Sequence, residues 1–269
     1  MKMYNDLKLI AKDFANAKST CVSEFEVPFD IETYLRKHKG EGETKGWKIL
    51  LHKDENNVLI DTLAYQINKK FKGQPLVIAP ILKGAAYFCV DLTRKLTIPY
   101  SLYFLEASSY KNSQSQEENV DFSNTIVPAK FQGKKVLLID ELFDNGKTLA
   151  TVKGALIKYT NLSSIDITTC CLFQKGKQSK YPSPDLVGMN QLPDVWYVGY
   201  GLDDEQTKRG FEHLFMKPRA KELQNEHDIV FYYDEHKQLR NMIYRNISEM
   251  KQKLLCDQFM DKVNECMGY

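Results

Sequence analysis

The 269-residue sequence predicts an α/β fold, in which helices cover both faces of a mostly parallel, twisted sheet. Short apolar segments, such as 75–82 and 134–140, alternate with longer segments whose apolar residues recur at helical spacing, such as 58–71 and 146–159. Strands with so few polar positions are typical of a parallel sheet that is buried on both sides. We therefore expect a doubly wound sheet.

The predicted elements follow one another in regular order. The segment 58–71 forms a helix, because its apolar residues lie near one helical face: Leu59, Ile60, Leu63, Ala64 and Ile67. A buried strand at 75–82 follows, and the alternation continues with a helix at 85–96, strands at 100–107 and 134–140, a helix at 146–159 and a strand at 164–173. In such sheets ligands bind beyond the carboxyl ends of the strands. We therefore expect the functional site where four loops meet, those after Ile81, Asp140, Phe173 and Tyr200.

Three segments lie outside this pattern. The pattern itself occupies the main domain, residues 48–216. Residues 1–47 form an N-terminal extension that ends in a polar, glycine-containing run. Residues 217–269 form a C-terminal, largely helical extension, which we expect to pack on its own domain or on a symmetric subunit of a homodimer or homotetramer. The polar segment between Tyr110 and Pro128 is either a mobile functional loop or disordered.

The composition is that of an ordinary globular protein. The net charge is +2, from 37 basic and 35 acidic residues, which gives no reason to expect nucleic acid or membrane as a partner. Six scattered cysteines without a CxxC pair favour reduced thiols, and we expect a cytoplasmic protein without zinc. Charged residues interrupt the first positions, so no signal peptide is predicted.

The stretch "VLLIDELFDNGKT", residues 136–148, joins an apolar strand to two acids and a glycine-containing turn. Gly146 permits close backbone approach, and the helix that follows exposes N–H groups that suit a phosphate. A P-loop is excluded, because the glycine that it requires five residues earlier is Glu141. A simpler interpretation is that Asp144 caps the helix and that the acid pair is merely solvated.

This stretch resembles the phosphoribosyl-pyrophosphate (PRPP) motif of the type I phosphoribosyltransferases. Three further stretches follow the order found in hypoxanthine-guanine phosphoribosyltransferases: "LVIAPILKGAAYF" resembles the pyrophosphate loop, "EASSYKNSQS" the mobile loop, and "PDVWYVGYGLDDEQTKR" the purine- and magnesium-binding segment. Together they span residues 48–215. The resemblance implies an enzyme of purine salvage that transfers the phosphoribosyl group of PRPP to hypoxanthine or guanine and uses Mg²⁺.

The resemblance also implies roles for individual residues. Asp144 would be the general base at the purine N7, and Asp140 and Glu141 would face the ribose hydroxyls. The residues that would bind the 5-phosphate are Asn145, Gly146, Lys147 and Thr148. Those that would contact pyrophosphate are Lys83, Gly84 and Arg209, and the mobile loop would contain Ser109 and Tyr110. The peptide between Leu82 and Lys83 is cis in many members of the family.

On the purine side, Lys175 would donate to the 6-oxo group, Trp196 would stack on the ring, and the backbone of Tyr197 would meet the base edge. Asp203 would hold the magnesium ion. Simpler interpretations remain: Trp196 as a core aromatic residue, and Lys175 and Arg209 as surface residues. The sequence departs from the family in the order of the acid pair and in having Asn145 where threonine is common.

Two other functions stay open. The chain could be a nucleotide-responsive regulator that binds nucleic acid, in which case it would need a basic face and salt-dependent binding. It could also be a phosphoribosyltransferase for another acceptor. The choice among hypoxanthine, guanine and xanthine is likewise open.

Overall fold

The computed structural model describes residues 47–106, 108–110, 119–121, 126–217 and 226–267. The chain divides into two compact units, one made of residues 1–58 together with 217–269 and the other of residues 59–216. The predicted domain limits at 48 and 216 stay a prediction.

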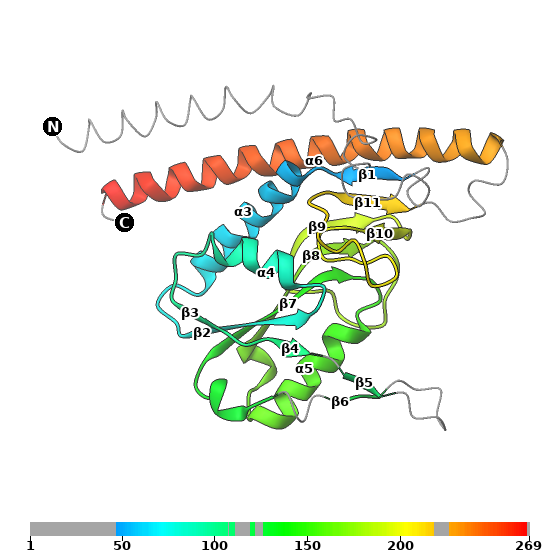
Figure 1. Cartoon of the computed structure of the whole chain (residues 1–269). Helices are drawn as coiled ribbons and strands as arrows, with labels where there is room; N and C mark the ends of the chain where they lie inside the picture. The colour runs from blue at the N-terminus through cyan, green and yellow to red at the C-terminus, as the bar shows by residue number, and fades with distance from the viewer. Residues whose placement is uncertain (1–46, 107, 111–118, 122–125, 218–225, 268–269) are drawn as a thin grey trace. The chain divides into compact units, whose positions relative to one another are not determined.

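The larger unit contains the parallel sheet. Its strands lie in the order β3 (Tyr100–Leu102), β2 (Leu76–Leu82), β7 (Lys135–Phe143), β8 (Ile167–Lys175) and β9 (Leu186–Leu192), and all neighbours run parallel (Figure 1). The short strand β4 (Leu105–Glu106) pairs with the end of β2. The winding direction reverses between β2 and β7, and that is where ligands bind in such sheets. The predicted doubly wound fold is confirmed.

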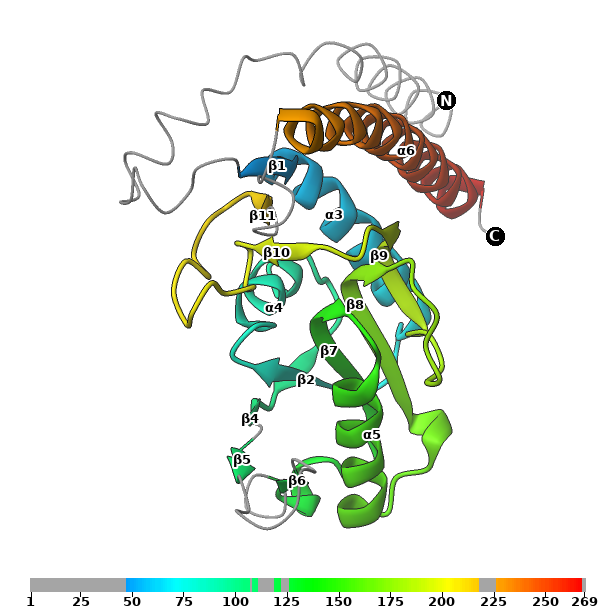
Figure 2. The same ribbon diagram turned by 90° about the vertical axis from the view of Figure 1, so that its right-hand side faces the viewer.

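Helices cover both faces of this sheet. Helix α4 (Ala86–Thr93) connects β2 to β3, and α5 (Lys147–Thr160) connects β7 to β8 in the opposite direction. The two crossovers run in opposite directions along the sheet, so connections of the usual right-handed kind place the two helices on opposite faces (Figure 2). Alternate strand residues, including Val77, Val136 and Leu138, pack in one buried cluster with Leu149 and Val152 of α5. Helix α3 (Lys53–Lys70) precedes β2, and 3₁₀ turns η1 (Pro128–Lys130) and η2 (Ser164–Asp166) precede β7 and β8.

Some predicted elements differ in detail. The segment 100–107 forms two short strands instead of one, and β7 continues past Asp140 to Phe143. The loop after Tyr200 does not follow a strand of the central sheet, because β10 (Trp196–Val198) pairs with β11 (Leu214–Lys217). Strands β5 (Ser108–Tyr110) and β6 (Asn119–Asp121) form an antiparallel pair. Most of the polar loop that was predicted between Tyr110 and Pro128 lies outside the described residues.

The smaller unit contains β1 (Lys48–Leu51), the start of α3 and the long helix α6 (Glu226–Met267). Arg240 of α6 donates to the carbonyl oxygen of Leu50 at 2.5 Å and to both carboxylate oxygens of Glu55 at 2.8 and 3.0 Å. Glu55 is fully buried, as are Ile243 and Ile247 of α6. The predicted helical C-terminal extension is confirmed. In the described part of the chain, no helix has an apolar stretch that could span a membrane.

Candidate active site

Two adjacent carboxyl groups lie near the carboxyl end of β7. Asp140 is buried and Glu141 is half-buried, and the Glu141 N–H donates to Asp140 Oδ1 at 3.1 Å. Burial, reinforced by the neighbouring Glu141 charge, raises the pKa of Asp140 well above its usual value. Burial also raises the pKa of Glu141, and the Glu141 Oε2 atom is buried without a hydrogen-bond partner among the described residues. The pair therefore favours an added proton or a cation.

The loop after β2 lies directly against this acid pair. The Leu82–Lys83 peptide is cis, as expected, and Lys83 is exposed. A Cβ added to Gly84 would lie 1.7 Å from Glu141 Oε1, and a Cβ added to Gly201 would lie 2.1 Å from the Gly84 carbonyl oxygen. Glycine at position 84 leaves room for the Glu141 carboxylate against this loop, and glycine at position 201, where φ is +99°, permits the two backbone segments to approach so closely.

Arg209 and Asp203 form an ion pair near the acid pair. The Nη2 atom of Arg209 lies 2.6 Å from Asp203 Oδ1, and its Nη1 atom donates to the Gly201 carbonyl oxygen at 2.8 Å. Asp203 Oδ2 accepts the Gln206 N–H at 2.8 Å. Arg209 is therefore a half-buried residue that an ion pair and a hydrogen bond fix to the 201–203 segment. Its charge also offsets part of the effect of burial on the pKa of Glu141.

The turn from β7 into α5 is shaped by Asn145 and Gly146. Gly146 has a φ of +82°, and a Cβ there would lie 2.6 Å from the Phe143 ring, so this position requires glycine. The side-chain oxygen of Asn145 accepts the Lys147 N–H at 2.9 Å, and the Asn145 carbonyl oxygen accepts the Ser179 hydroxyl at 2.7 Å. The other first-turn N–H groups of a helix have no intrahelical acceptor, and Thr148 lies exposed beside them. This geometry suits a phosphate.

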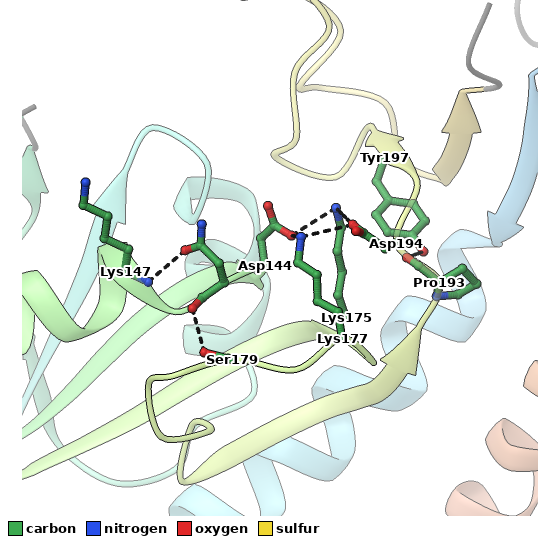
Figure 3. A network of polar contacts seen from close by, with 9 residues as sticks. Asp144, Lys147, Lys175, Lys177, Ser179, Pro193, Asp194 and Tyr197 are labelled. Atoms are coloured by element: carbon green, nitrogen blue, oxygen red, sulfur yellow. Dashed lines mark hydrogen bonds and ion pairs between the residues drawn. The ribbon is translucent and has the colours of Figure 1, made fainter. Parts of the chain in front are cut away.

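Four charged side chains meet beyond this turn (Figure 3). Asp144 Oδ1 lies 3.1 Å from the Nζ atom of Lys175 and 2.5 Å from that of Lys177. Asp194 Oδ1 lies 2.9 and 3.1 Å from the same two nitrogen atoms. Burial alone would raise the pKa of Asp144, but the hydrogen bonds from Lys177 and Lys175 outweigh it and lower that pKa. Asp144 is therefore a carboxylate at neutral pH.

Aromatic side chains flank this charge cluster. Lys175 is 8% exposed, so it is not the surface lysine of the simpler interpretation, and its Nζ atom lies 5.8 Å from the centroid of the Tyr197 ring. Tyr197 is buried and its hydroxyl donates to the Pro193 carbonyl oxygen at 2.5 Å. Trp196 is 56% exposed, and its assignment as a core aromatic residue is wrong. An exposed indole next to Tyr197 in β10 can stack on a planar ligand.

The charge distribution suits a divalent cation. Mg²⁺ prefers oxygen ligands, keeps several waters and is commonly held by one or two carboxylates together with substrate phosphates. Glu141 Oε2 is a buried oxygen without a partner among the described residues, and the Asp203 carboxylate belongs to the same charged group. No cluster of three or more metal-binding side chains is present in the described part. The residues present therefore fit a magnesium ion that a substrate helps to hold.

The structure brings most of the predicted residues to this edge. Ser109 and Tyr110 lie in β5, and their side chains are outside the described part. Lys177 and Asp194 were not predicted. Lys177 lies in the bend just beyond β8, two residues after Lys175, and this closeness along the chain is the signal that could have identified it. Asp194 is 19 residues from Lys175, so no local signal identifies it.

The acid pair, the loop after β2 that contains Gly84, and the N-terminus of α5 thus define an α/β protein with a ligand site between β2 and β7, where the winding direction of its sheet reverses. Residues 46–205 match the family model of the phosphoribosyl transferase domain, which is more than half of the chain. The chain therefore belongs to the phosphoribosyltransferase family.

Several relatives have names that agree with the motifs. The chain is 28% identical over 174 residues to a hypoxanthine-guanine phosphoribosyltransferase of Staphylococcus aureus, a match that covers 64% of this chain and 95% of the relative. It is 29% identical over 170 residues to a hypoxanthine phosphoribosyltransferase of Buchnera aphidicola, covering 62% and 93%. The crystal structure of the Trypanosoma cruzi hypoxanthine phosphoribosyltransferase matches with a TM-score of 0.54 at 27% identity, covering 64% of this chain and 97% of that one. The resemblance to hypoxanthine-guanine phosphoribosyltransferases is confirmed.

Proposed function

We propose that this protein transfers the phosphoribosyl group of PRPP to a 6-oxopurine, hypoxanthine or guanine, and releases pyrophosphate with IMP or GMP. The observation that supports this most directly is the convergence at one sheet edge of the acid pair, the Asp144–Lys175 ion pair and the N-terminus of α5. The names of the relatives support the choice of purine.

The sugar phosphate is bound at the turn between β7 and α5. The 5-phosphate accepts N–H groups of the first turn of α5 and the Thr148 hydroxyl, in the turn that Asn145, Gly146 and Lys147 form. Asp140 and Glu141 face the ribose hydroxyls. As the bond between C1 and the pyrophosphate oxygen breaks, its electron pair leaves with pyrophosphate and positive charge develops on the ribose. The carboxylates stabilise that charge.

The purine is held by the charge cluster and the aromatic residues. Lys175 donates to the 6-oxo oxygen, Trp196 stacks on the ring, and the Tyr197 backbone meets the base edge. The purine N9 forms the new bond to C1, and the proton on N7 passes to the Asp144 carboxylate. A general base of this kind contributes about 10²–10⁴ in rate.

The leaving group is bound by Lys83, by the backbone at Gly84 and by Arg209. Asp203 and the acid pair would hold Mg²⁺ together with PRPP, and the bound ion would neutralise charge on pyrophosphate. The segment that contains Ser109 and Tyr110 would exclude water from the ribosyl cation.

Two further proposals concern the setting of the enzyme. The five described cysteines are free thiols, and the scattered cysteine pattern supports a cytoplasmic location. A homodimer or homotetramer is proposed from the long helix of the C-terminal extension, which has the length to pack on a second subunit.

An acceptor screen tests the function. PRPP and Mg²⁺ are mixed with the protein and with one base at a time, namely hypoxanthine, guanine, xanthine, adenine or a pyrimidine, and pyrophosphate release is measured. Release with hypoxanthine or guanine but not adenine is expected. Release only with a pyrimidine would show a transferase for another acceptor. No release with any base, together with salt-dependent binding of DNA or RNA, would favour the regulatory function.

A further inference from the structure

Lys177 and Asp194 complete a ring of four alternating charges of which the proposed reaction uses only two. Going round the ring, Asp144 Oδ1 lies 3.1 Å from Lys175 Nζ, which lies 2.9 Å from Asp194 Oδ1. Asp194 Oδ1 lies 3.1 Å from Lys177 Nζ, which in turn lies 2.5 Å from Asp144 Oδ1. Each ammonium group therefore bridges both carboxylates (Figure 3).

The two lysines are not equivalent. Lys175 is the last residue of β8 and its side chain is 9% exposed, whereas Lys177 follows the strand with a side chain that is 31% exposed. The carboxylates are more open, at 46% for Asp144 and 49% for Asp194. The Lys175 ammonium group has three N–H donors; two are directed at the Asp144 and Asp194 carboxylates, which leaves the third for a ligand.

Charge balance then indicates what Lys177 does. With two lysines the four groups are neutral together, and Lys175 can turn to a ligand oxygen while Lys177 still bridges Asp144 and Asp194. Without Lys177, Lys175 would be the only ammonium group of the ring between two carboxylates. The two carboxylates would then compete with a ligand for its N–H groups, and because both are about half-exposed, the effect on ligand binding is the modest one of partly exposed ion pairs.

We propose that Lys177 is a positioning residue for purine binding: by pairing with Asp194 and Asp144 it leaves Lys175 available to donate to the 6-oxo oxygen. The inference rests on the proposed function and adds a determinant of base affinity at the same site. Lys177 acts through the ring and does not itself contact the purine.

The charged and titratable groups that face Asp144 come from three parts of the chain. They are Lys175 at the end of β8, Lys177 after it, Asp194 just before β10, and Tyr197 within β10. Of these, Lys177 and Lys175 lower the pKa of Asp144 by hydrogen bonding, against the opposing effect of burial. Removal of Lys177 should therefore move the titration of Asp144 to higher pH, whereas removal of Asp194 should move it to lower pH.

A double-mutant cycle in steady-state kinetics tests the charge balance. In Lys177→Gln, the KM for the purine should rise by about two- to fivefold, the range expected of partly exposed ion pairs, with the KM for PRPP unchanged. The double variant Lys177→Gln/Asp194→Asn restores one lysine to one carboxylate, so its purine KM should return toward the wild-type value. Lys177→Arg keeps the charge and should stay near wild type. The exposed Lys130, at the opposite end of β7, provides the control Lys130→Gln, which should change nothing.

Two kinetic results would overturn the proposal. If the double variant is as impaired as the two single variants combined, Lys177 does not act by balancing Asp194. If the PRPP and purine KM values rise together in Lys177→Gln, the change is a general structural one.

A carboxyl NMR titration separates this inference from the proposed function. ¹³C-labelled Asp144 is followed with pH in the wild type and in Lys177→Gln, without any substrate. A shift of its midpoint to higher pH in the variant supports the ring even if the acceptor screen finds no purine transfer, whereas that screen alone decides the function. An unchanged midpoint would overturn the inference whatever the enzyme does.

Discussion

Replacement of Gly84 by alanine should displace the Glu141 carboxylate while leaving the stability of the fold nearly unchanged. The added methyl group would start 1.7 Å from Glu141 Oε1, so this oxygen would have to move about 1.7 Å to reach the 3.4 Å at which ordinary contact begins. The obstacle is the end of a flexible side chain, and Glu141 can rotate away at little cost. We expect the free energy of unfolding to change by less than about 1 kcal/mol.

Activity should respond quite differently. A displacement of more than 1 Å at a reacting centre can lower the rate by about 10²-fold, and we expect a loss of this size in kcat/KM for Gly84→Ala. Gly201→Ala is the contrasting variant, because its methyl group would meet a backbone oxygen at 2.1 Å and its φ of +99° is unfavourable for alanine. It should lose about 1–3 kcal/mol of stability in addition to activity.

The assays are urea unfolding and pyrophosphate release, with Gly154→Ala as a control. A Cβ at Gly154 in α5 meets nothing within 4 Å, so this variant should be as stable as the wild type or about 0.5–1 kcal/mol more stable. The reasoning would be refuted if Gly84→Ala kept wild-type kcat/KM, or if it lost as much stability as Gly201→Ala.

Four further outcomes follow from the same contacts. Asp144→Asn should lower kcat by about 10²–10⁴-fold while a titration still detects PRPP binding, and an unchanged kcat would remove the assigned base. Trp196→Ala should raise the purine KM about tenfold and Trp196→Phe much less, as measured by initial rates. Burial raises the pKa of Glu141, so the contribution of this residue to the free energy of unfolding is greatest below the ordinary carboxyl pKa of about 4 and declines as pH rises through the higher pKa of the folded state. Glu141→Gln should flatten this decline, as measured by thermal unfolding between pH 4 and 8. Arg240→Ala removes the ion-pair partner of the buried Glu55 and should cost about 3 kcal/mol in urea unfolding, part of which Glu55→Gln should restore.

The parts of the fold that the sequence predicted well are those with local causes. The apolar runs at 76–81 and 136–139 are buried on both faces, and this pattern alone indicates parallel strands. The turn at Gly146 was predictable because a glycine between a strand and a helical segment typically marks a backbone conformation that other residues adopt only with strain. The predicted start of the helix near Lys147 is confirmed.

The parts that were not predicted depend on contacts between distant positions. Strand β9 has exposed and half-buried positions that break the apolar pattern, and it was not recognised as a sheet strand. The strand before Tyr200 was placed in the central sheet because it is apolar and short, but its partner is β11. The ring of charges joins Asp144, Lys177 and Asp194 across two connections of the fold, and sequence spacing alone does not measure such a distance.

The most direct test of a sugar-phosphate site at this edge is calorimetry of PRPP binding in the presence of Mg²⁺. Wild-type protein should bind with measurable heat, and Thr148→Val, which removes one hydroxyl donor beside the N-terminus of α5, should bind about tenfold or more weakly because a hydrogen bond to a charged phosphate is lost. Absence of heat with the wild type, or equal affinity in the two proteins, would contradict the proposal that the acid pair and the start of α5 grip one sugar phosphate.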